Sequence, residues 1–264
     1  MKTTALIDAD IVAYQAASSS EQPIKWDDDL WTLHAFESEA IVKFNSMIDG
    51  MVEKVEADNV ILAFTDSNNW RKEVLPTYKS NRATTRKPML LRALGDYAAE
   101  NYKTYKRPTL EGDDCLGILS TMKTTLQEQF VVCSIDKDFK TIPGKHYDFG
   151  KDEFFEITEH EADYWHMYQT LTGDATDGYK GCPGAGPVGA TKILKAALEE
   201  GTPWANREQL CGIMWKHVVA AYEKAGLSEE DALIQARVAR ICRASDYDFV
   251  NKKVKLWEPY AYNG

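Results

Sequence analysis

Short apolar runs alternate with longer amphipathic stretches over the first 150 residues of the chain. The apolar runs are short enough for buried strands and lie at residues 3–7, 59–64 and 130–134. The amphipathic stretches have helical spacing and cover residues 11–17, 33–55, 88–100 and the segment after Asp113. Strands that alternate with helices form a mostly parallel central sheet flanked by helices. The pattern therefore predicts an α/β core.

Other stretches give weaker predictions. A third strand is expected at residues 102–106, two short strands within residues 145–157, and a returning strand within residues 248–257. Residues 22–29 contain a proline and several polar positions, and we expect a loop there or the approach to the next helix.

Two capping-box patterns start helices in the second half of the chain. Thr158 and Glu161 begin one that ends near Leu171, and Ser228 begins another that continues through Arg243. We expect an α/β core over residues 1–171, which includes a basic segment at 67–107. A region made of a helix-hairpin-helix and C-terminal helices, residues 172–264, is expected to pack on it.

Composition limits the class of protein. Of the 264 residues, 44% are hydrophobic, which is enough for a packed core. The five cysteines form no CxxC pair and indicate reduced thiols. The chain has neither an apolar run of membrane-spanning length nor an N-terminal signal peptide pattern. We therefore expect a cytoplasmic protein, in the host cell if the chain is encoded by a phage.

Charge is unevenly distributed. The net charge is −10, which argues against nonspecific coating of DNA by the whole surface. Residues 71–107 nevertheless carry ten Lys or Arg against three acids. A basic segment in an acidic protein indicates a partner with phosphates, bound on one face. The alternative is an ordinary solvated loop and helix face.

Carboxylates follow the predicted strands and precede a predicted helix. They are Asp8, Asp66, Glu111, Asp113, Asp114, Asp136, Asp138, Asp174 and Asp177. In a parallel sheet the first seven would converge on one edge. So many anions would not stay ionised together without cations, and ligands that are all oxygen suit Mg²⁺ or Mn²⁺. Two such ions are the usual device for cutting phosphodiester bonds. For the acids near residue 111, stabilisation of a helix N-terminus is the alternative.

A glycine-rich stretch covers residues 172–197. Gly184, Gly186 and Gly189 match G-x-G-x-x-G, but no strand precedes them, so a dinucleotide site is rejected. Two helices joined by a glycine hairpin explain the stretch better. The backbone N–H groups of such a hairpin, together with Lys192, would face a phosphate. An ordinary corner between helices is the alternative.

These motifs together resemble the flap endonuclease and 5′-nuclease family, most closely its phage 5′→3′ exonucleases of the T-seven type. The matching pieces run along nearly the whole chain: LIDADIVAYQA, VILAFTDSNNWRKEVLPTYKSNR, LEGDDCLG, SIDKDFKTIP, ADYWH, GDATDGYKG and YDFVNKKVKLW. The resemblance implies that the nine acids above bind metal. It also implies that Tyr78, Lys79 and Arg82 act at the scissile phosphate. A potassium ion at the hairpin of Gly184 and Gly186 is a further implication.

The expected function is a metal-dependent 5′→3′ exonuclease of duplex DNA with two Mg²⁺ ions, for which Mn²⁺ would substitute, in phage DNA replication or degradation. RNA in RNA–DNA hybrids is left open as a second substrate. Asp10 is expected to support the acids. The expected DNA contacts are Arg71, Lys72, Arg86, Lys87, Gly184, Gly186, Gly189 and Lys192.

Three alternatives remain. A flap endonuclease is one, although the basic segment is shorter than in flap-cutting members. A haloacid-dehalogenase-type phosphatase is another, because Asp8 and Asp10 match its D-x-D, but it leaves Glu111 to Asp114 unexplained. The third is a DNA-binding accessory protein without catalysis, which the acids argue against because they repel DNA unless metals are bound.

Overall fold

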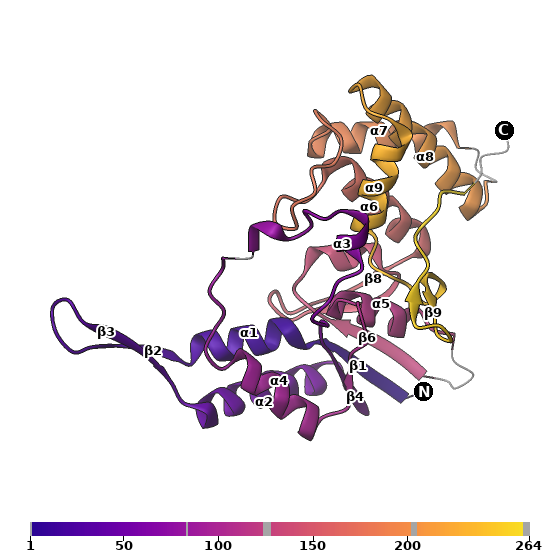
Figure 1. Cartoon of the computed structure of the whole chain (residues 1–264). Helices are drawn as coiled ribbons and strands as arrows, with labels where there is room; N and C mark the ends of the chain where they lie inside the picture. The colour runs from indigo at the N-terminus through magenta and orange to yellow at the C-terminus, as the bar shows by residue number, and fades with distance from the viewer. Residues whose placement is uncertain (1, 83, 124–127, 202–204, 261–264) are drawn as a thin grey trace. The chain divides into compact units, whose positions relative to one another are not determined.

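The chain forms two compact units, which are interleaved in sequence. The computed structural model describes residues 2–82, 84–123, 128–201 and 205–260 (Figure 1). Unit 1 comprises residues 1–68, 85–136 and 144–156, and unit 2 comprises residues 69–84, 137–143 and 157–264. The expected division at residue 171 differs from these units, because part of the basic segment and residues 137–143 are built into the helical unit.

A six-stranded sheet forms the centre of unit 1, with strand order β5-β4-β1-β6-β7-β8. Its strands are β1 (Lys2–Asp8), β4 (Asn59–Ala63), β5 (Thr104–Tyr105), β6 (Glu128–Cys133), β7 (Gly144–Asp148) and β8 (Glu153–Ile157). From β5 to β7, each neighbouring pair is parallel. The connection between β7 and β8 is too short for a parallel crossover, so β8 returns antiparallel. The mostly parallel sheet confirms the predicted fold class.

Helices cover both faces of this sheet. The helices α1 (Ala9–Ser19), α2 (Glu37–Lys54) and α4 (Leu91–Asn101) contact one another and bury their apolar sides with Ala5 and Ile7 of β1. Leu6 is fully buried but lies outside this cluster, as expected because successive strand residues point to opposite faces. On that opposite face, α5 (Gly112–Thr121) packs against β1, β4 and β6.

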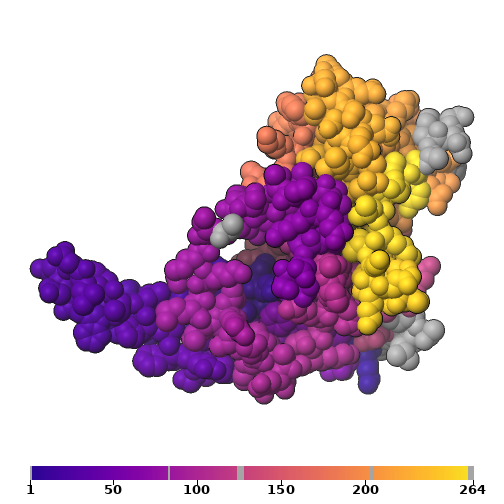
Figure 2. Space-filling model, viewed as in Figure 1, coloured from indigo at the N-terminus to yellow at the C-terminus, as the bar shows by residue number. Residues whose placement is uncertain are grey.

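The expected loop at residues 22–29 is correct only for residues 26–29, and the expected start of the next helix at residue 33 is wrong. A β-hairpin of β2 (Glu21–Lys25) and β3 (Trp31–Ala35) occupies this stretch, and α2 begins only at Glu37. The hairpin, indigo in Figure 2, projects away from the rest of unit 1 and exposes Trp26, Leu30 and Trp31. The two strands were not predicted because neither has a buried face, and because Pro23 and the acidic turn favoured a loop.

Unit 2 is mainly helical. Its longer helices are α6 (Glu159–Thr172), α7 (Pro187–Glu200), α8 (Arg207–Lys224) and α9 (Glu229–Ala239), and its short ones are α3 (Arg71–Val74), η1 (Ser80–Arg82), η2 (Lys137–Thr141) and η3 (Ala244–Asp246). The four longer helices surround an apolar core that includes Leu171, Leu194, Met214 and Tyr222. Among the described residues, every helix is too short or too polar to span a bilayer.

Two expectations for minor elements need correction. The helix that starts at Ser228 ends at Ala239 and not at Arg243, because Arg240 takes an extended backbone. The strand expected within residues 248–257 is a separate two-stranded hairpin of β9 (Tyr247–Asp248) and β10 (Lys253–Val254). Both capping boxes are present as predicted.

Candidate active site

Three acids of unit 1 follow adjacent parallel strands. Asp8 is the last residue of β1, Asp66 comes three residues after β4, and Asp136 comes three residues after β6. Because β4, β1 and β6 are neighbours and run in parallel, their carboxyl ends lie at one edge of the sheet. Open α/β sheets bind their ligands at this edge.

The start of α5 brings a second set of acids to the same edge. The amide N–H of Gly112 donates a hydrogen bond of 2.9 Å to Thr65 Oγ1, in the loop after β4. Glu111 and Asp114 form a capping box at this helix start and are buried, whereas Asp113 is half-buried. The helix-cap alternative therefore holds for Glu111 and Asp114, which are nonetheless placed beside the strand ends.

Asp8 is the most strongly perturbed carboxylate. It is 2% exposed, it accepts a hydrogen bond of 2.8 Å from the Ser134 hydroxyl, and it caps α1 through the N–H of Ile11. Burial, followed by the charge of Asp10, raises the pKa of Asp8 to about 7, and the charge of Asp136 adds to this. These carboxylates are therefore close enough to repel one another.

Two supporting side chains tie the loops of this edge together. Asp10 accepts a hydrogen bond of 2.9 Å from the N–H of Thr65, and burial raises its pKa. Ser134 donates to Asp8 and accepts a bond of 3.1 Å from the N–H of Asp136. The supporting position of Asp10 is as expected. Ser134 was missed, although a serine two residues before Asp136 was visible in the sequence.

Asp66 lies in a different electrostatic environment. The N–H of Thr109 donates a hydrogen bond of 3.0 Å to its carboxylate, and Lys106 Nζ lies 3.8 Å away. Mainly because of the bond from Thr109, the pKa of Asp66 is lowered. The surroundings of Asp66 thus favour its charged form, whereas burial disfavours the charged form of Asp8 at the same edge.

Unit 2 holds the other three predicted ligands. Lys137 Nζ lies 2.9 Å from Asp174 Oδ2 and 3.5 Å from Asp138 Oδ1. Burial alone would raise the pKa of Asp174, but the hydrogen bond from Lys137 outweighs burial and lowers it. The same bond raises the pKa of Lys137 to about 12. Lys137 was not among the predicted site residues, although it stands between Asp136 and Asp138 in the sequence.

Asp136 and Asp138, although only two positions apart in the sequence, have different structural surroundings. Asp138 lies in the 3₁₀ helix η2, where its carbonyl accepts from the Thr141 hydroxyl and its carboxylate from the Gln169 amide. These bonds anchor Asp138 in unit 2, while Asp136 belongs to unit 1.

Asp177 organises the predicted catalytic cations. Its carboxylate accepts hydrogen bonds of 2.8 Å from the Tyr78 hydroxyl and 2.7 Å from Arg82 Nη2, and Lys79 Nζ lies 3.5 Å away. The N–H of Lys79 also donates to the Asp177 carbonyl. The structure therefore brings Tyr78, Lys79 and Arg82 together around one carboxylate.

A pair of glycines closes the loop that carries Asp174 and Asp177. Gly173 and Gly181 both have a φ of +66°, and a Cβ added to Gly173 would lie 2.4 Å from the Lys180 carbonyl carbon. An antiparallel bridge between Asp174 and Tyr179 narrows the loop further. Only glycine allows the two chain segments to approach so closely.

The cations expected to contact DNA are in different situations. Arg71 is 2% exposed and donates to the carbonyls of Val238 and Arg240, so in this structure it cannot reach a phosphate. Arg71 was expected to contact DNA because of its charge, but it packs beside α9 and is part of the core. Arg86 is exposed but forms a two-bond pair with Glu21, and Lys72 and Lys87 are exposed.

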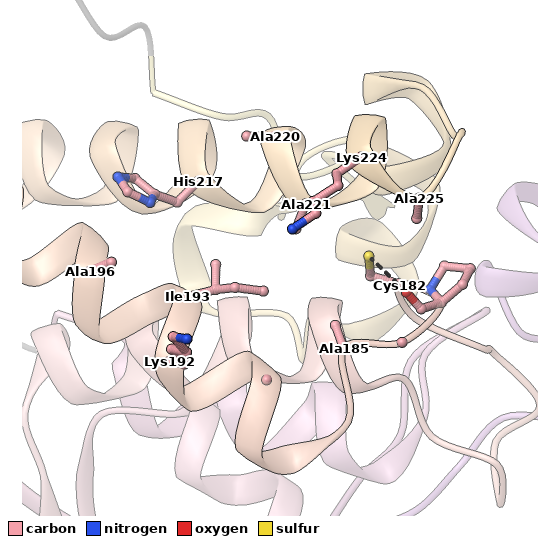
Figure 3. Close-up of a pocket in the computed structure, with 13 residues that line it drawn as sticks. Cys182, Ala185, Lys192, Ile193, Ala196, His217, Ala220, Ala221, Lys224 and Ala225 are labelled. Atoms are coloured by element: carbon pink, nitrogen blue, oxygen red, sulfur yellow. Dashed lines mark hydrogen bonds between the residues drawn. The ribbon is translucent and has the colours of Figure 1, made fainter.

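The glycine hairpin precedes α7 and adjoins a hollow of about 600 Å³ between α7 and α8. Figure 3 shows the small side chains that line this hollow, with Lys192 on α7 and Lys224 on α8. Gly184, Gly189 and Lys192 line it, and Gly186 is the N-cap of α7. Two helices, α6 and α7, flank the glycines as predicted, but residues 173–186 connect them and carry the loop of Asp174 and Asp177 as well as the glycine turn.

Donor chemistry fits divalent metal ions. The candidate ligands are carboxylates, which suit Mg²⁺ or Mn²⁺. Of these ligands, Asp136 lies near enough to Asp8 for its charge to add to the rise in the pKa of Asp8, which burial mainly causes. Within residues 2–82, 84–123, 128–201 and 205–260, no three His, Cys, Asp or Glu side chains are already arranged to hold an ion.

Comparisons with known proteins agree with this geometry. Residues 3–164 match the family model described as the 5′-3′ exonuclease N-terminal, resolvase-like domain. The chain belongs to the 5′-3′ exonuclease family. It is 33% identical to the exonuclease of Escherichia phage T7, over 96% of this chain and 93% of the relative. It is 32% identical to the exodeoxyribonuclease of Enterobacteria phage T3, over 96% and 92%.

Among solved structures, the flap endonuclease of bacteriophage T5 in complex with DNA and metal ions has a TM-score of 0.61. The match covers 90% of this chain and 89% of that one at 14% identity, which shows a shared fold. Membership of the 5′-3′ exonuclease family makes this chain a nuclease, and the phosphatase and accessory-protein alternatives are excluded.

Proposed function

We propose that this nuclease is a metal-dependent 5′→3′ exodeoxyribonuclease that hydrolyses duplex DNA from the 5′ end with two divalent ions. The observation that carries the proposal is the placement of carboxylates at the carboxyl ends of β1, β4 and β6. Similarity to phage exonucleases over nearly the whole chain supports it, as well as a role in phage DNA replication or degradation inside the host cell.

Each unit contributes candidate ligands for Mg²⁺, for which Mn²⁺ would substitute. Those of unit 1 are Asp8, Asp66, Glu111, Asp113, Asp114 and Asp136, and those of unit 2 are Asp138, Asp174 and Asp177. When bound, such ions activate a water molecule and stabilise the leaving oxygen. Ser134 and Asp10 keep the loops of unit 1 in place through the hydrogen bonds to Asp8 and Thr65.

Lys79 and Arg82 supply positive charge for the scissile phosphate. Arg82 presents a planar fork that matches phosphate oxygens, and Lys79 acts as a point charge. Asp177 and Tyr78 hold these cations in place, since the carboxylate contacts both and Tyr78 is 2% exposed. Charge placed where negative charge develops stabilises the transition state more than the ground state.

Duplex DNA labelled at either the 5′ or the 3′ end tests the polarity of attack. With Mg²⁺, the 5′ label should appear first in short products, while strands labelled at the 3′ end shorten progressively. EDTA should stop both reactions. Early release of the 3′ label would contradict the proposed polarity, and internal cuts at a branched junction would favour a flap endonuclease. An RNA–DNA hybrid in parallel shows whether RNA is also removed.

Asp113→Asn tests the role of the acids. The variant should cut less than a thousandth as fast as wild type, with duplex affinity retained, because it loses a ligand and keeps the cations. Asp96→Asn is the matched control, since Asp96 is a 73% exposed acid on α4. Turnover of Asp113→Asn within tenfold of wild type would exclude it as a ligand.

The glycine hairpin is proposed as a second contact with the DNA backbone. Gly184, which has a φ of +79°, and Gly186 are exposed with no atom within 4 Å of an added Cβ, and Lys192 is exposed on the next helix. A potassium ion bound at this turn would link its carbonyl groups to a phosphate. Duplex affinity measured in K⁺ and in Na⁺ at equal ionic strength tests this, and equal affinities would exclude a potassium site.

A further inference from the structure

Lys137 places a positive charge between two of the carboxylates proposed as ligands. Its Nζ lies 2.9 Å from Asp174 Oδ2 and 3.5 Å from Asp138 Oδ1. One ammonium group thus connects η2 with the loop that follows α6, and all three residues belong to unit 2.

The carboxylates are fixed, and the lysine is the partner that can move. The side chain of Lys137 is 72% exposed, against 19% for Asp138 and 8% for Asp174. Asp174 Oδ1 accepts bonds of 2.7 and 3.2 Å from the N–H groups of Thr176 and Asp177, and Asp138 accepts from Gln169. The long, flexible stem of a lysine can swing away while both acids keep these bonds.

Coordination of a metal ion at Asp174 would exclude this ion pair. Mg²⁺ binds carboxylate oxygens at about 2.0–2.1 Å and keeps several waters, so an ion at Oδ2 would occupy the space of the ammonium group. Two like charges at such a distance would also repel each other strongly. The released ammonium group would then need another anion.

We propose that Lys137 is an exchangeable cation, which pairs with Asp138 and Asp174 until a divalent ion displaces it and then contacts a phosphate of the bound nucleic acid. The inference rests on the proposed function for the metal and the substrate. Metal binding and this DNA contact are then coupled, and each increases the affinity for the other.

Mn²⁺ titration of the whole protein without DNA tests the first half. Free Mn²⁺ is measured by electron paramagnetic resonance, so the readout does not depend on activity. Lys137→Met keeps the length of the side chain and removes its charge. We expect this variant to bind the more weakly held Mn²⁺ ion about two- to tenfold more tightly than wild type does. The gain is modest because the ion pairs of Lys137 with Asp138 and Asp174, which compete with the metal, are partly exposed and individually weak. Lys137→Arg should remain close to wild type.

Lys216→Met is the matched control. Lys216 Nζ lies 2.9 Å from Glu200 Oε1, the same distance as in the pair of Lys137 with Asp174, but Glu200 is not a proposed ligand. Its Mn²⁺ affinity should equal that of wild type. Unchanged or weaker Mn²⁺ binding by Lys137→Met would overturn the inference. Absence of Mn²⁺ binding by the wild-type protein would instead overturn the proposed metal dependence.

The salt dependence of duplex binding tests the second half. DNA with phosphorothioate linkages at its 5′ ends prevents cleavage during the measurement. With saturating Mn²⁺, Lys137→Met should make the slope of log affinity against log salt less negative by about 0.9, the value for one lost phosphate contact. In EDTA the slope should not change. A change of equal size in both conditions would make Lys137 a permanent DNA contact, and no change in either would remove it from the interface.

Discussion

Asp177 uses its carboxylate to hold the two cations on which phosphate chemistry is expected to depend. Lys79 has a positive φ of 53°, an unusual conformation for a residue with a side chain, and its N–H bonds to the Asp177 carbonyl. Backbone and side-chain bonds therefore fix its direction together. A residue held in a strained conformation by several partners is typical of functional positions.

We expect Lys79→Ala and Arg82→Ala each to lower kcat about tenfold to a thousandfold, the range for loss of one transition-state donor. Duplex affinity should fall far less, because other cations remain. Single-turnover rates at saturating enzyme measure this directly. Arg92→Ala is the control, since Arg92 is 94% exposed on α4. If both variants cut at wild-type speed and only the Kd changes, these residues only attract the DNA.

A second residue-scale prediction concerns Asp163, a buried acid in the core of unit 2. It pairs with Arg207 and lies 2.9 Å from Arg243 Nη1. Burial alone would raise the pKa of Asp163, but these arginines outweigh burial and lower it to about 2. Because the folded state binds this proton more weakly than the unfolded chain, stability is lost as pH falls from about 4 to about 2.

The lowered pKa of Asp163 corresponds to roughly 2 kcal/mol of pH-dependent stability. Asp163→Asn should lower the free energy of unfolding at pH 7 by about 3 kcal/mol or more, since it leaves buried Arg243 without its charge partner. The variant should also lose less stability than wild type between pH 4 and 2. Urea unfolding at both pH values measures this, and identical pH dependence in the two proteins would show that Asp163 is not the titrating group.

Among the elements, those with clear periodicity were predictable from the sequence. The strands β1, β4 and β6 were apparent because each is an apolar run followed by an acid, and α6 and α9 because capping boxes begin them. The hairpin of β2 and β3 was missed because most of its residues are exposed, so alternation of polar and apolar positions carries no signal. The local pattern of polar and apolar residues indicates which positions are buried, and an exposed hairpin buries few side chains.

The residues of the candidate site likewise fall into those that the sequence predicted and those that it did not. Acids at strand ends were identified because sequence order fixes which strands end in a carboxylate. Burial of Arg71 and the contacts of Lys137 depend on which distant segments pack beside them, α9 in one case and the loop after α6 in the other. A charge in the sequence gives no such information, so these two residues required the structure.

At the scale of one loop, Gly173 should tolerate no larger residue. Its positive φ and a Cβ clash of 2.4 Å with the backbone at Lys180 predict that Gly173→Ala destabilises the protein by about 2 kcal/mol or more. Gly50→Ala in α2 is the control. No atom lies within 4 Å of its added Cβ, so it should stabilise by about 0.5–1 kcal/mol. Thermal unfolding of both variants decides, and equal melting temperatures would contradict the close approach.

At the scale of the whole molecule, the acidic residues oppose folding unless cations are present. The net charge is −10, and some of the acids lie near one another. At Asp8, for example, burial and the charges of Asp10 and Asp136 raise the pKa of the carboxyl group. The basic segment and Lys137 offset part of this repulsion within each unit. Folding, metal binding and DNA binding are therefore expected to be thermodynamically linked.

Mg²⁺ should accordingly raise the melting temperature. An ion that binds only the folded state stabilises it by RT ln(1 + [L]/Kd), about 2.7 kcal/mol at a concentration of 100 Kd. For a chain of this size each kcal/mol corresponds to about 2–4 °C. Calorimetry with and without EDTA measures the shift.

Asp136→Asn separates repulsion from metal binding. In EDTA the variant should melt above wild type, because one charge beside Asp8 is gone. With Mg²⁺ it should gain less than wild type, because a ligand is gone as well. Asp96→Asn should match wild type in both conditions, since that acid is exposed on α4. Melting curves of Asp136→Asn that equal those of wild type in both conditions would contradict a shared acidic site. A higher melting temperature in EDTA combined with a smaller gain from Mg²⁺ is the outcome that a shared site predicts.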